Sequence, residues 1–409
     1  MKNKYLEYQD EILHLFENGV GFAEIARHLI DNHRLEVAPD YLRKQVGEIV
    51  RYLISDKEIV AYNIKLAKQK QRAQDLNRIA NKSFRESARV ENALVEYNKE
   101  LISLLRSESL KTTVKKHKDT TKAALVVQIA DTHFNELVDL DSNKYDFQIA
   151  SKRLQKFAHN IKRYARFYGV KNILVAITGD LINSDRRLDE KLSMSTNRAK
   201  ATFLGVHLLK HFIMDLNTVA NIQVCCVTGN ESRVNEELGW VDIVASDNYD
   251  FTIFEILNLL LPDIHFIKGG ALEVVVEING QNLLVIHGHQ LGKMTSNDVG
   301  KVISKYTAKG IIINMIICGH LHETMIRDNI CRSASLVGSN AYSENALNLS
   351  GTAAQNIYIF TNDGRHDVRI DLQETDLWDG YPINEELSAY NAKSIGKTYK
   401  KQTIFKIIV

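Results

Sequence analysis

The chain has 409 residues, of which 44% are hydrophobic and 25% charged, with 3 Pro and 21 Gly. This ordinary globular composition excludes collagen-like, mucin-like and largely disordered classes, and the length predicts two or three domains. The longest apolar runs, of about eight residues, are far shorter than the roughly 20 residues that span a bilayer, so we expect no membrane association.

The net charge of +2 conceals segments of different charge. Residues 1–56 carry net −3, residues 57–122 net +8, and the remainder net −3. We therefore predict a helical domain over 1–56, a basic helical linker over 57–122, a main domain over 123–370 and a C-terminal extension over 371–409. Acidic residues in the first apolar stretch oppose a secretory signal, and four Cys without CxxC spacing are typical of a reducing compartment, so we expect a cytoplasmic location.

The first 56 residues predict three short helices, over Glu7–Phe16, Phe22–Ile30 and Tyr41–Leu53. The stretch Gly19–Leu29 resembles the first two helices of helix-turn-helix domains, which implies DNA binding. A small helical interaction domain is the alternative, because the acidic net charge of this segment opposes phosphate binding.

Residues 57–122 contain neither Pro nor Gly and predict a long amphipathic helix, followed by a polar hinge over Val114–Thr121. On one side of this helix, apolar residues recur at a spacing of three or four: Val90, Leu94, Tyr97, Leu101 and Leu104. Its polar side is rich in Lys and Arg and could follow a nucleic-acid backbone. The alternatives are a solvated linker and a helix that joins two copies in a homo-oligomer.

From Leu125 onward, short apolar strands alternate with helical stretches, which predicts an α/β domain. Five strand-like runs each end in side chains capable of chemistry. Leu125–Ala130 precedes Asp131 and His133, Ile173–Ile177 precedes Asp180, Ile222–Val227 precedes Asn230 and Glu231, Leu283–Ile286 precedes His287 and His289, and Ile311–Cys318 precedes His320 and His322. Residues just beyond the carboxyl ends of strands are where an α/β sheet places its site.

This mixture of imidazole, carboxylate and amide groups is typical of a two-metal centre. Two divalent cations about 3.5–4 Å apart need a shared anionic bridge, which one Asp carboxylate can provide. The donor set suits Mn²⁺ first, or Fe or Zn²⁺, and is too rich in nitrogen for Mg²⁺ or Ca²⁺. We expect the glycines before Asp180, Asn230 and His320 to let the backbone turn sharply, so that each following side chain points inward.

Over about residues 123–365, the five motifs together resemble the calcineurin-like metallophosphoesterases. The resemblance implies an α/β fold of four layers, with a double β-sheet sandwich flanked by helices. It assigns Asp131, His133 and His322 to one metal and Asn230, His287 and His320 to the other, and it makes Asp180 the bridge. It also implies hydrolysis of phosphate esters, in which water attacks phosphorus while both cations neutralise charge on the phosphoryl oxygens.

The third motif departs from the family pattern. The family usually has Gly-Asn-His, whose His is thought to protonate the leaving oxygen, whereas this chain has Glu231. Either Glu231 or His289 supplies the proton, or the substrate has a better leaving group. Otherwise Glu231 only forms a salt bridge with Arg233, and His289 supports a metal ligand or contacts phosphate.

Candidate substrate contacts are Arg186, Arg187 and Arg198, which could clamp phosphate or lie on a solvated helix. Arg233 is a further candidate, and Tyr342 could stack on a base. With the basic segment and the helix-turn-helix-like start, they predict a DNA exonuclease or other nuclease, resembling the repair-exonuclease branch of the family. The alternatives are a small-molecule phosphatase or cyclic-nucleotide phosphodiesterase with an N-terminal oligomerisation region, and a DNA-binding protein with an inert metal site.

Overall fold

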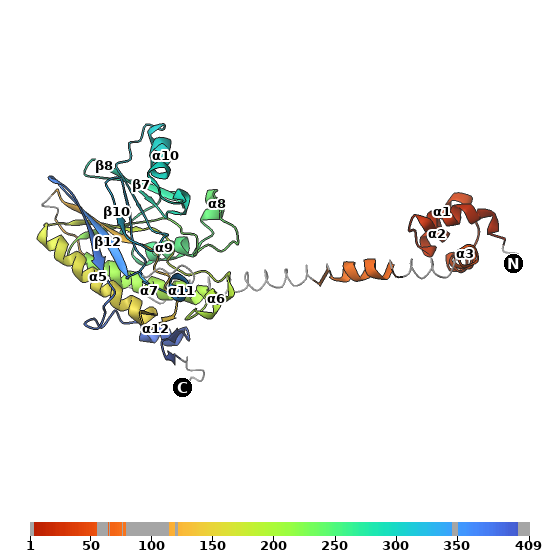
Figure 1. Ribbon diagram of the computed structural model, residues 1–409, viewed down its shortest axis with the longest axis horizontal. Coiled ribbons are helices and arrows are strands. Elements are labelled where there is room, and N and C mark those ends of the chain that lie inside the picture. Colours follow the sequence, from red (N-terminus) through yellow and green to blue (C-terminus); the bar gives the residue numbers. More distant parts are fainter. Residues whose placement is uncertain are drawn as a thin grey trace. The chain divides into compact units, whose positions relative to one another are not determined.

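The computed structural model describes residues 4–54, 64, 66–75, 77–78, 114–118, 122–345 and 351–399 (Figure 1). The chain divides into two compact units, Met1–Leu104 and Leu105–Val409, and each is described by itself. Within the described residues, no helix combines the length and the apolar character needed to cross a membrane.

The N-terminal unit begins with a 3-10 turn at Leu6–Tyr8, followed by α1 (Gln9–Glu17), α2 (Phe22–His33) and α3 (Pro39–Leu53). The three helices lie where the sequence predicts them, and Pro39 starts α3 because a proline at the first helical position sacrifices no hydrogen bond. Ile12, Leu29 and Val46, one from each helix, are fully buried in a shared core. In the predicted linker, the described residues 64, 66–75 and 77–78 are helical and residues 114–118 are not, whereas its apolar stripe from Val90 to Leu104 lies outside the described residues.

Two β-sheets form the centre of the second unit. The six-stranded sheet has the order β13-β12-β1-β4-β5-β6, with β1 (Ala124–Ile129), β4 (Asn172–Ile177), β5 (Asn221–Cys226), β6 (His265–Ile267), β12 (Ala354–Thr361) and β13 (Gly364–Asp371). The five-stranded sheet has the order β10-β11-β9-β8-β7, with β7 (Glu273–Ile278), β8 (Gln281–Ile286), β9 (Met315–Cys318), β10 (Met325–Ile326) and β11 (Ile330–Arg332). The predicted mixed α/β class is therefore confirmed.

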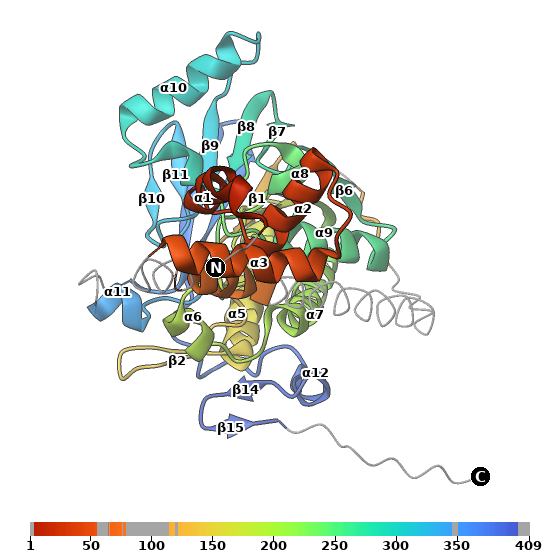
Figure 2. The ribbon, with the colours of Figure 1, turned by 90° about the vertical axis from the view of Figure 1, so that its right-hand side faces the viewer.

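The two sheets pack face to face. Val126 and Ala176 of the first sheet share one buried cluster with Val285 and Ile317 of the second. Because side chains alternate between the faces of a strand, the outer faces remain for helices. The helix α10 (Ser296–Thr307) packs on the outer side of the five-stranded sheet, and α5 (Phe147–Phe167), α7 (Arg198–Asn217) and α9 (Tyr249–Leu260) lie on the side of the six-stranded sheet (Figures 1 and 2).

Smaller elements complete the unit: the hairpins β2–β3 (Val138–Asp139, Lys144–Tyr145) and β14–β15 (Lys393–Ser394, Lys397–Thr398), the helices α6 (Leu188–Leu192), α8 (Asp242–Ala245), α11 (Ala341–Asn345) and α12 (Asn384–Ala389), and a 3-10 turn at His289–Leu291. Residues 371–399 pack on the same unit, since the amide of Gly380 donates to Gln155 on α5 at 3.0 Å and that of Ile395 to Asp146 at 3.1 Å. Residues 400–409 of the predicted C-terminal extension lie outside the described residues.

Two sequence predictions need correction. The strand expected over Ile311–Cys318 begins only at Met315, because the Asn314 side chain accepts the backbone N–H of Asn282 at 2.8 Å and ends the preceding loop, where Ile312 is exposed. The hinge expected over Val114–Thr121 is anchored in its described part: the amides of Lys115 and His117 donate to the side chains of Asn217 and Asn221 at 2.8 Å each.

Candidate metal centre

The five motif-bearing strands are shared between the two sheets. β1, β4 and β5 are parallel neighbours in the six-stranded sheet, and β8 and β9 are parallel neighbours in the other. Their carboxyl ends meet where the sheets face each other, and the structure brings all seven predicted ligands together there: Asp131, His133, Asp180, Asn230, His287, His320 and His322.

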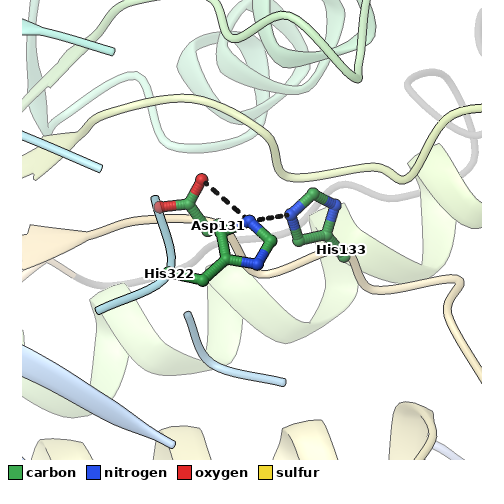
Figure 3. Close-up of side chains that lie close together, drawn as sticks. All are labelled: Asp131, His133 and His322. Atoms are coloured by element: carbon green, nitrogen blue, oxygen red, sulfur yellow. Dashed lines mark hydrogen bonds and ion pairs between the residues drawn. The ribbon is translucent and has the colours of Figure 1, made fainter. Parts of the chain in front are cut away.

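One group of ligands consists of Asp131, His133 and His322 (Figure 3). The Nε2 atoms of the two imidazoles face each other at 3.2 Å, and Nε2 of His322 lies 3.7 Å from Oδ1 of Asp131. Burial lowers the pKa of His133, and it lowers the pKa of His322 to about 3, so both rings are neutral at pH 7. Neutral imidazole is the form that binds metals, and this geometry fits a cation between the three side chains.

The second group forms around His287. Its Nδ1 lies 2.7 Å from the carbonyl oxygen of Thr178 and therefore donates, because a carbonyl can only accept. Its Nε2 faces two oxygens, Oδ2 of Asp180 at 3.1 Å and Oδ1 of Asn230 at 2.9 Å. Imidazole nitrogen, carboxylate and amide oxygen thus converge on one point, and the partner on Nδ1 fixes the tautomer that frees Nε2 for a metal.

The charges of His287 and Asp180 stabilise each other. Burial disfavours the imidazolium of His287, yet the negative charge of Asp180 prevails and raises its pKa to about 10. Burial would raise the pKa of Asp180 as well, but the charge of His287 and its hydrogen bond hold it well below the usual range. A divalent ion at this point would replace the proton on His287 as the counter-charge of Asp180.

Asp131 and Asp180 link the two groups. One ligand atom from each, with one from His287, lies within 4.8 Å of the other two. Burial raises the pKa of Asp131 to about 8; His287 opposes this shift and the negative charge of Asp180 adds to it. The ring centre of His320 lies 5.1 Å from that of His287, and burial lowers the pKa of His320 to about 4. Two close, buried carboxyl groups beside several imidazoles form a donor set that suits a pair of cations.

The backbone at the ligands is strained. The described residues include nine non-glycine positions with positive φ, and five of them are predicted ligands: Asp131 (48°), His133 (40°), Asp180 (55°), His320 (78°) and His322 (56°). Such conformations are uncommon outside glycine and cost of the order of 1–3 kcal/mol each. Their concentration at one site indicates that the fold sacrifices stability to aim these side chains.

The glycines before the ligands have two different roles. Gly179 has a φ of 91°, which agrees with the sharp turn expected from the sequence. Gly229 and Gly319 do not need a left-handed backbone; they allow close approach instead. A Cβ at Gly229 would lie 2.1 Å from Oδ1 of Asp180, and one at Gly319 would lie 2.2 Å from Oδ2 of Asp131.

The structure gives Glu231 a different partner from the one considered in the sequence. Its Oε2 pairs with Arg186 at 3.0 Å and its Oε1 accepts from the Asn230 amide at 2.6 Å, whereas Arg233 donates to the carbonyl oxygens of Asn230 and Glu236. Burial raises the pKa of Glu231, and the negative charge of Asp180 adds to the shift. Glu231 therefore lies beside the second group of predicted ligands.

The remaining candidate residues differ in how close they lie to the predicted ligands and in what they contact. Arg187 lines the cavity beside the metal ligands and pairs with Glu190 at 2.7 Å. Arg198 is buried, and its guanidinium binds Asp185 and the carbonyl oxygens of Glu231 and Arg233, so it braces the loop after β5. The ring of His289 lies tilted against those of Trp240 and His287, with centres 5.4 Å apart in both pairs, and burial lowers its pKa to about 3. The side chain of Tyr342 lies outside the part that the structure describes.

A cavity of about 380 Å³ opens beside the ligands. Asp180, Asn230, His320 and His322 form one wall. The remaining walls are rich in acidic side chains, Glu136, Asp139, Asp189, Glu190 and Glu231, with Arg187 among them. The cavity is therefore acidic on the sides away from the predicted ligands.

Sequence reasoning missed Asp250 and Asn248, two buried residues at the start of α9. Asp250 accepts backbone N–H bonds from both Asp180 and Gly229, and Asn248 donates to the carbonyl oxygen of Gly229 at 2.9 Å. In the sequence, these two residues form an Asn-x-Asp motif before an apolar helical run. Such a motif is typical of an ordinary helix N-terminus and does not indicate a role at a metal site.

No protein-family model and no curated protein matches the chain. Solved structures with some similarity include Vps29 complexed with Zn²⁺ from Entamoeba histolytica, at 15% identity over 61% of this chain and 99% of that one, with a TM-score of 0.28. A predicted phosphoesterase from Streptococcus pneumoniae TIGR4 has 12% identity over 64% and 94% of the two chains and a TM-score of 0.28. A cold-active protein tyrosine phosphatase mutant has 11% identity over 65% and 86%, with a TM-score of 0.27. At these TM-scores the similarities assign neither family nor activity to this chain.

Proposed function

We propose that the chain is a two-metal-dependent phosphoester hydrolase of the calcineurin-like metallophosphoesterase type. The observation that carries this proposal is the arrangement around His287, whose Nε2, freed by the bond from Nδ1 to Thr178, shares one point with oxygens of Asp180 and Asn230. The neighbouring group of Asp131, His133 and His322 supports a second ion. Two divalent ions, with Mn²⁺ the first choice, would activate water for attack on phosphorus and offset the charge that develops on the phosphoryl oxygens.

The chain's own residues divide the work. Asp131, His133 and His322 would hold one ion, Asn230, His287 and His320 the other, and Asp180 both. Glu231 lines the cavity beside Asn230, where its carboxyl group can deliver a proton to the leaving oxygen. Arg186 holds that carboxyl group in place, and His289 supports the second group through its ring contact with His287.

For the natural substrate, DNA is the first proposal. Its support is the Lys- and Arg-rich segment 57–122 and the helix-turn-helix-like pattern of Gly19–Leu29, neither of which a small-molecule hydrolase needs. An exonuclease or other nuclease would use these parts to bind the phosphate backbone and the metal centre to cleave one ester bond.

A small phosphate ester or cyclic nucleotide is the second candidate, and the acidic cavity favours it. Asp139, Asp189 and Glu190 would repel the additional phosphates of a polynucleotide, and Arg187 already pairs with Glu190. A substrate with a single phosphate at the metal centre avoids this repulsion.

An activity panel with Mn²⁺ decides between the two candidates. It should compare single- and double-stranded DNA, RNA, cyclic nucleotides, phosphomonoesters and a nitrophenyl diester. Hydrolysis of none of them, by protein shown to contain two ions, would contradict the proposed activity. DNA engagement through several phosphates should also weaken steeply with salt, with a slope of about −0.9 per phosphate contacted, whereas a small nucleotide gives a shallow slope.

A deletion of residues 1–113 tests whether DNA binding and hydrolysis depend on different parts of the chain. The deletion keeps Lys115 and His117, which bind Asn217 and Asn221. We expect unchanged hydrolysis of the nitrophenyl diester and DNA affinity lower by at least about 10-fold, because many phosphate contacts are lost. Unchanged DNA affinity would contradict a DNA-binding role of the N-terminal part.

A further inference from the structure

The loops that carry Asp180 and Asn230 are tied to one buried carboxylate. Oδ2 of Asp250 accepts the backbone N–H groups of Asp180 at 2.9 Å and of Gly229 at 2.8 Å, and Oδ1 accepts that of Leu181 at 2.8 Å. Asp250 is fully buried in the first turn of α9. One side chain thus connects the loop after β4 with the loop after β5, from a position 70 residues beyond Asp180 in the sequence.

These bonds act where the backbone needs support. Asp180 has a φ of 55°, and Gly229 approaches it so closely that no Cβ would fit between them. Hydrogen bonds to a buried carboxylate are stronger than those between neutral groups, so they can hold a conformation that costs of the order of 1–3 kcal/mol. Asp180 and Asn230, the residues that follow Gly179 and Gly229, both contribute an oxygen to the point faced by Nε2 of His287.

The neighbouring Asn248 completes the connection. Its side-chain amide donates to the carbonyl oxygen of Gly229 at 2.9 Å, and its Oδ1 accepts the N–H of Asp250 at 2.8 Å. Asn248 and Asp250 therefore hold both backbone groups of Gly229, the residue immediately before Asn230. We call this pair the loop clamp.

We propose that Asp250, supported by Asn248, is a positioning residue of the metal centre, which sets the separation of the Asp180 and Asn230 oxygens and thereby the affinity for the ion that they share with His287. This inference rests on the proposed function. Asp250 does not contact the metal ligands' side chains through any of these bonds; it acts through their backbone. Groups that orient metal ligands commonly change metal affinity or activity by 10–100-fold when they are replaced.

The substitution Asp250→Asn tests the loop clamp with little change of shape. The amide nitrogen that replaces one carboxylate oxygen cannot accept, so at least one of the three backbone N–H groups loses its partner. Asp146→Asn is the matched control, because Asp146 is also a buried cap that accepts two backbone N–H groups, from Ile149 at 2.9 Å and Ile395 at 3.1 Å. Neither of these donors belongs to a ligand-bearing loop.

The measurement is calorimetric titration of the metal-free full-length chain with Mn²⁺, accompanied by electron paramagnetic resonance of the loaded protein. We expect two sites in the wild type, a 10–100-fold weaker affinity for at least one site in D250N with altered coupling between the two spins, and wild-type affinity in D146N. A folded D250N with wild-type affinities and spectrum would overturn the role of Asp250 and leave the proposed function standing. A wild type with fewer than two sites would instead contradict the proposed function.

Asn248→Ala keeps the test decisive if D250N does not fold. It removes the contact with the Gly229 carbonyl oxygen but leaves the Asp250 carboxylate in place. We expect a smaller loss of Mn²⁺ affinity, of several-fold, at the same site. An unchanged affinity in folded N248A would contradict the loop clamp.

Discussion

The N-terminal helical unit and the metal centre are built in opposite ways. The helical unit buries apolar side chains, leaves the pairs of Glu11 with His28 and His33 partly exposed, and has a single described non-glycine residue with positive φ, Arg34, which ends α2. The candidate metal centre buries carboxyl groups and imidazoles, and five of its predicted ligands have a left-handed backbone conformation. Burial of apolar side chains stabilises the helical unit. The second region instead contains strained backbone and buried charged groups, and a bound cation would offset their cost in free energy.

Replacing the shared carboxylate should break the metal centre most completely. In Asp180→Asn, the bridging charge is lost, and with it several kcal/mol of transition-state stabilisation, so we expect Mn²⁺-dependent hydrolysis to fall by at least about 10³-fold and one ion to be lost. Initial rates and metal content measure both effects. The control Asp215→Asn, which breaks an ion pair with Lys162 elsewhere in the unit, should keep both metals. A fully active D180N would end the two-metal account.

A substitution of Glu231 tests proton transfer to the leaving oxygen separately from metal binding. In Glu231→Gln, the side chain can no longer give a proton to the leaving oxygen, so diesters with poor leaving groups should react about 10²-fold more slowly or worse. A nitrophenyl diester needs little protonation and should be affected far less. The ratio of kcat/KM for the two substrates gives the answer, and an equal decrease for both would argue against an acid role.

Substitutions of two glycines compare a position where the backbone lies close to a predicted ligand with a position that has open space around it. In Gly319→Ala, the new Cβ would lie 2.2 Å from Oδ2 of Asp131 and push this ligand away, so we expect Mn²⁺ affinity to fall by about 10-fold or more. In Gly300→Ala, on the exposed side of α10, the Cβ meets nothing within 4 Å, and the protein should gain up to about 1 kcal/mol of stability. Calorimetric titration and thermal unfolding measure the two variants. Wild-type metal affinity in G319A would show that the close approach is not required.

The smallest effect should come from the helical unit. The hydrogen bond to His33 lowers the pKa of Glu11, against the opposing effect of burial and with help from His28. A carboxyl group whose pKa is depressed on folding stabilises the protein above its unfolded pKa, about 4.5, and this contribution is lost as the pH falls through the folded value. Because the pair is partly exposed, we expect at most about 1 kcal/mol. Glu11→Gln should abolish this part of the pH dependence in calorimetry between pH 6 and pH 3, and Glu17→Gln on the same helix should retain it.

Local patterns were enough to predict much of the site. Each ligand follows an apolar run that forms a strand, so Asp131, Asp180 and His287 could be placed at strand ends from their neighbours alone. Contacts between distant segments could not be found in this way. Asp250 reaches two loops across the fold, Glu231 pairs with Arg186 instead of Arg233, and Gly229 is needed because another loop approaches it, which no local pattern encodes. The start of β9 at Met315, instead of Ile311, could not be predicted locally either, since it depends on the contact between Asn314 and Asn282.

Anomalous scattering from crystals of the full-length chain loaded with Mn²⁺ tests the central claim most directly. Two peaks about 3.5–4 Å apart should appear, one next to Asp131, His133 and His322 and one next to Asn230, His287 and His320, with Asp180 touching both. A pocket with no peak, or with one ion that leaves either group of ligands empty, would contradict the account.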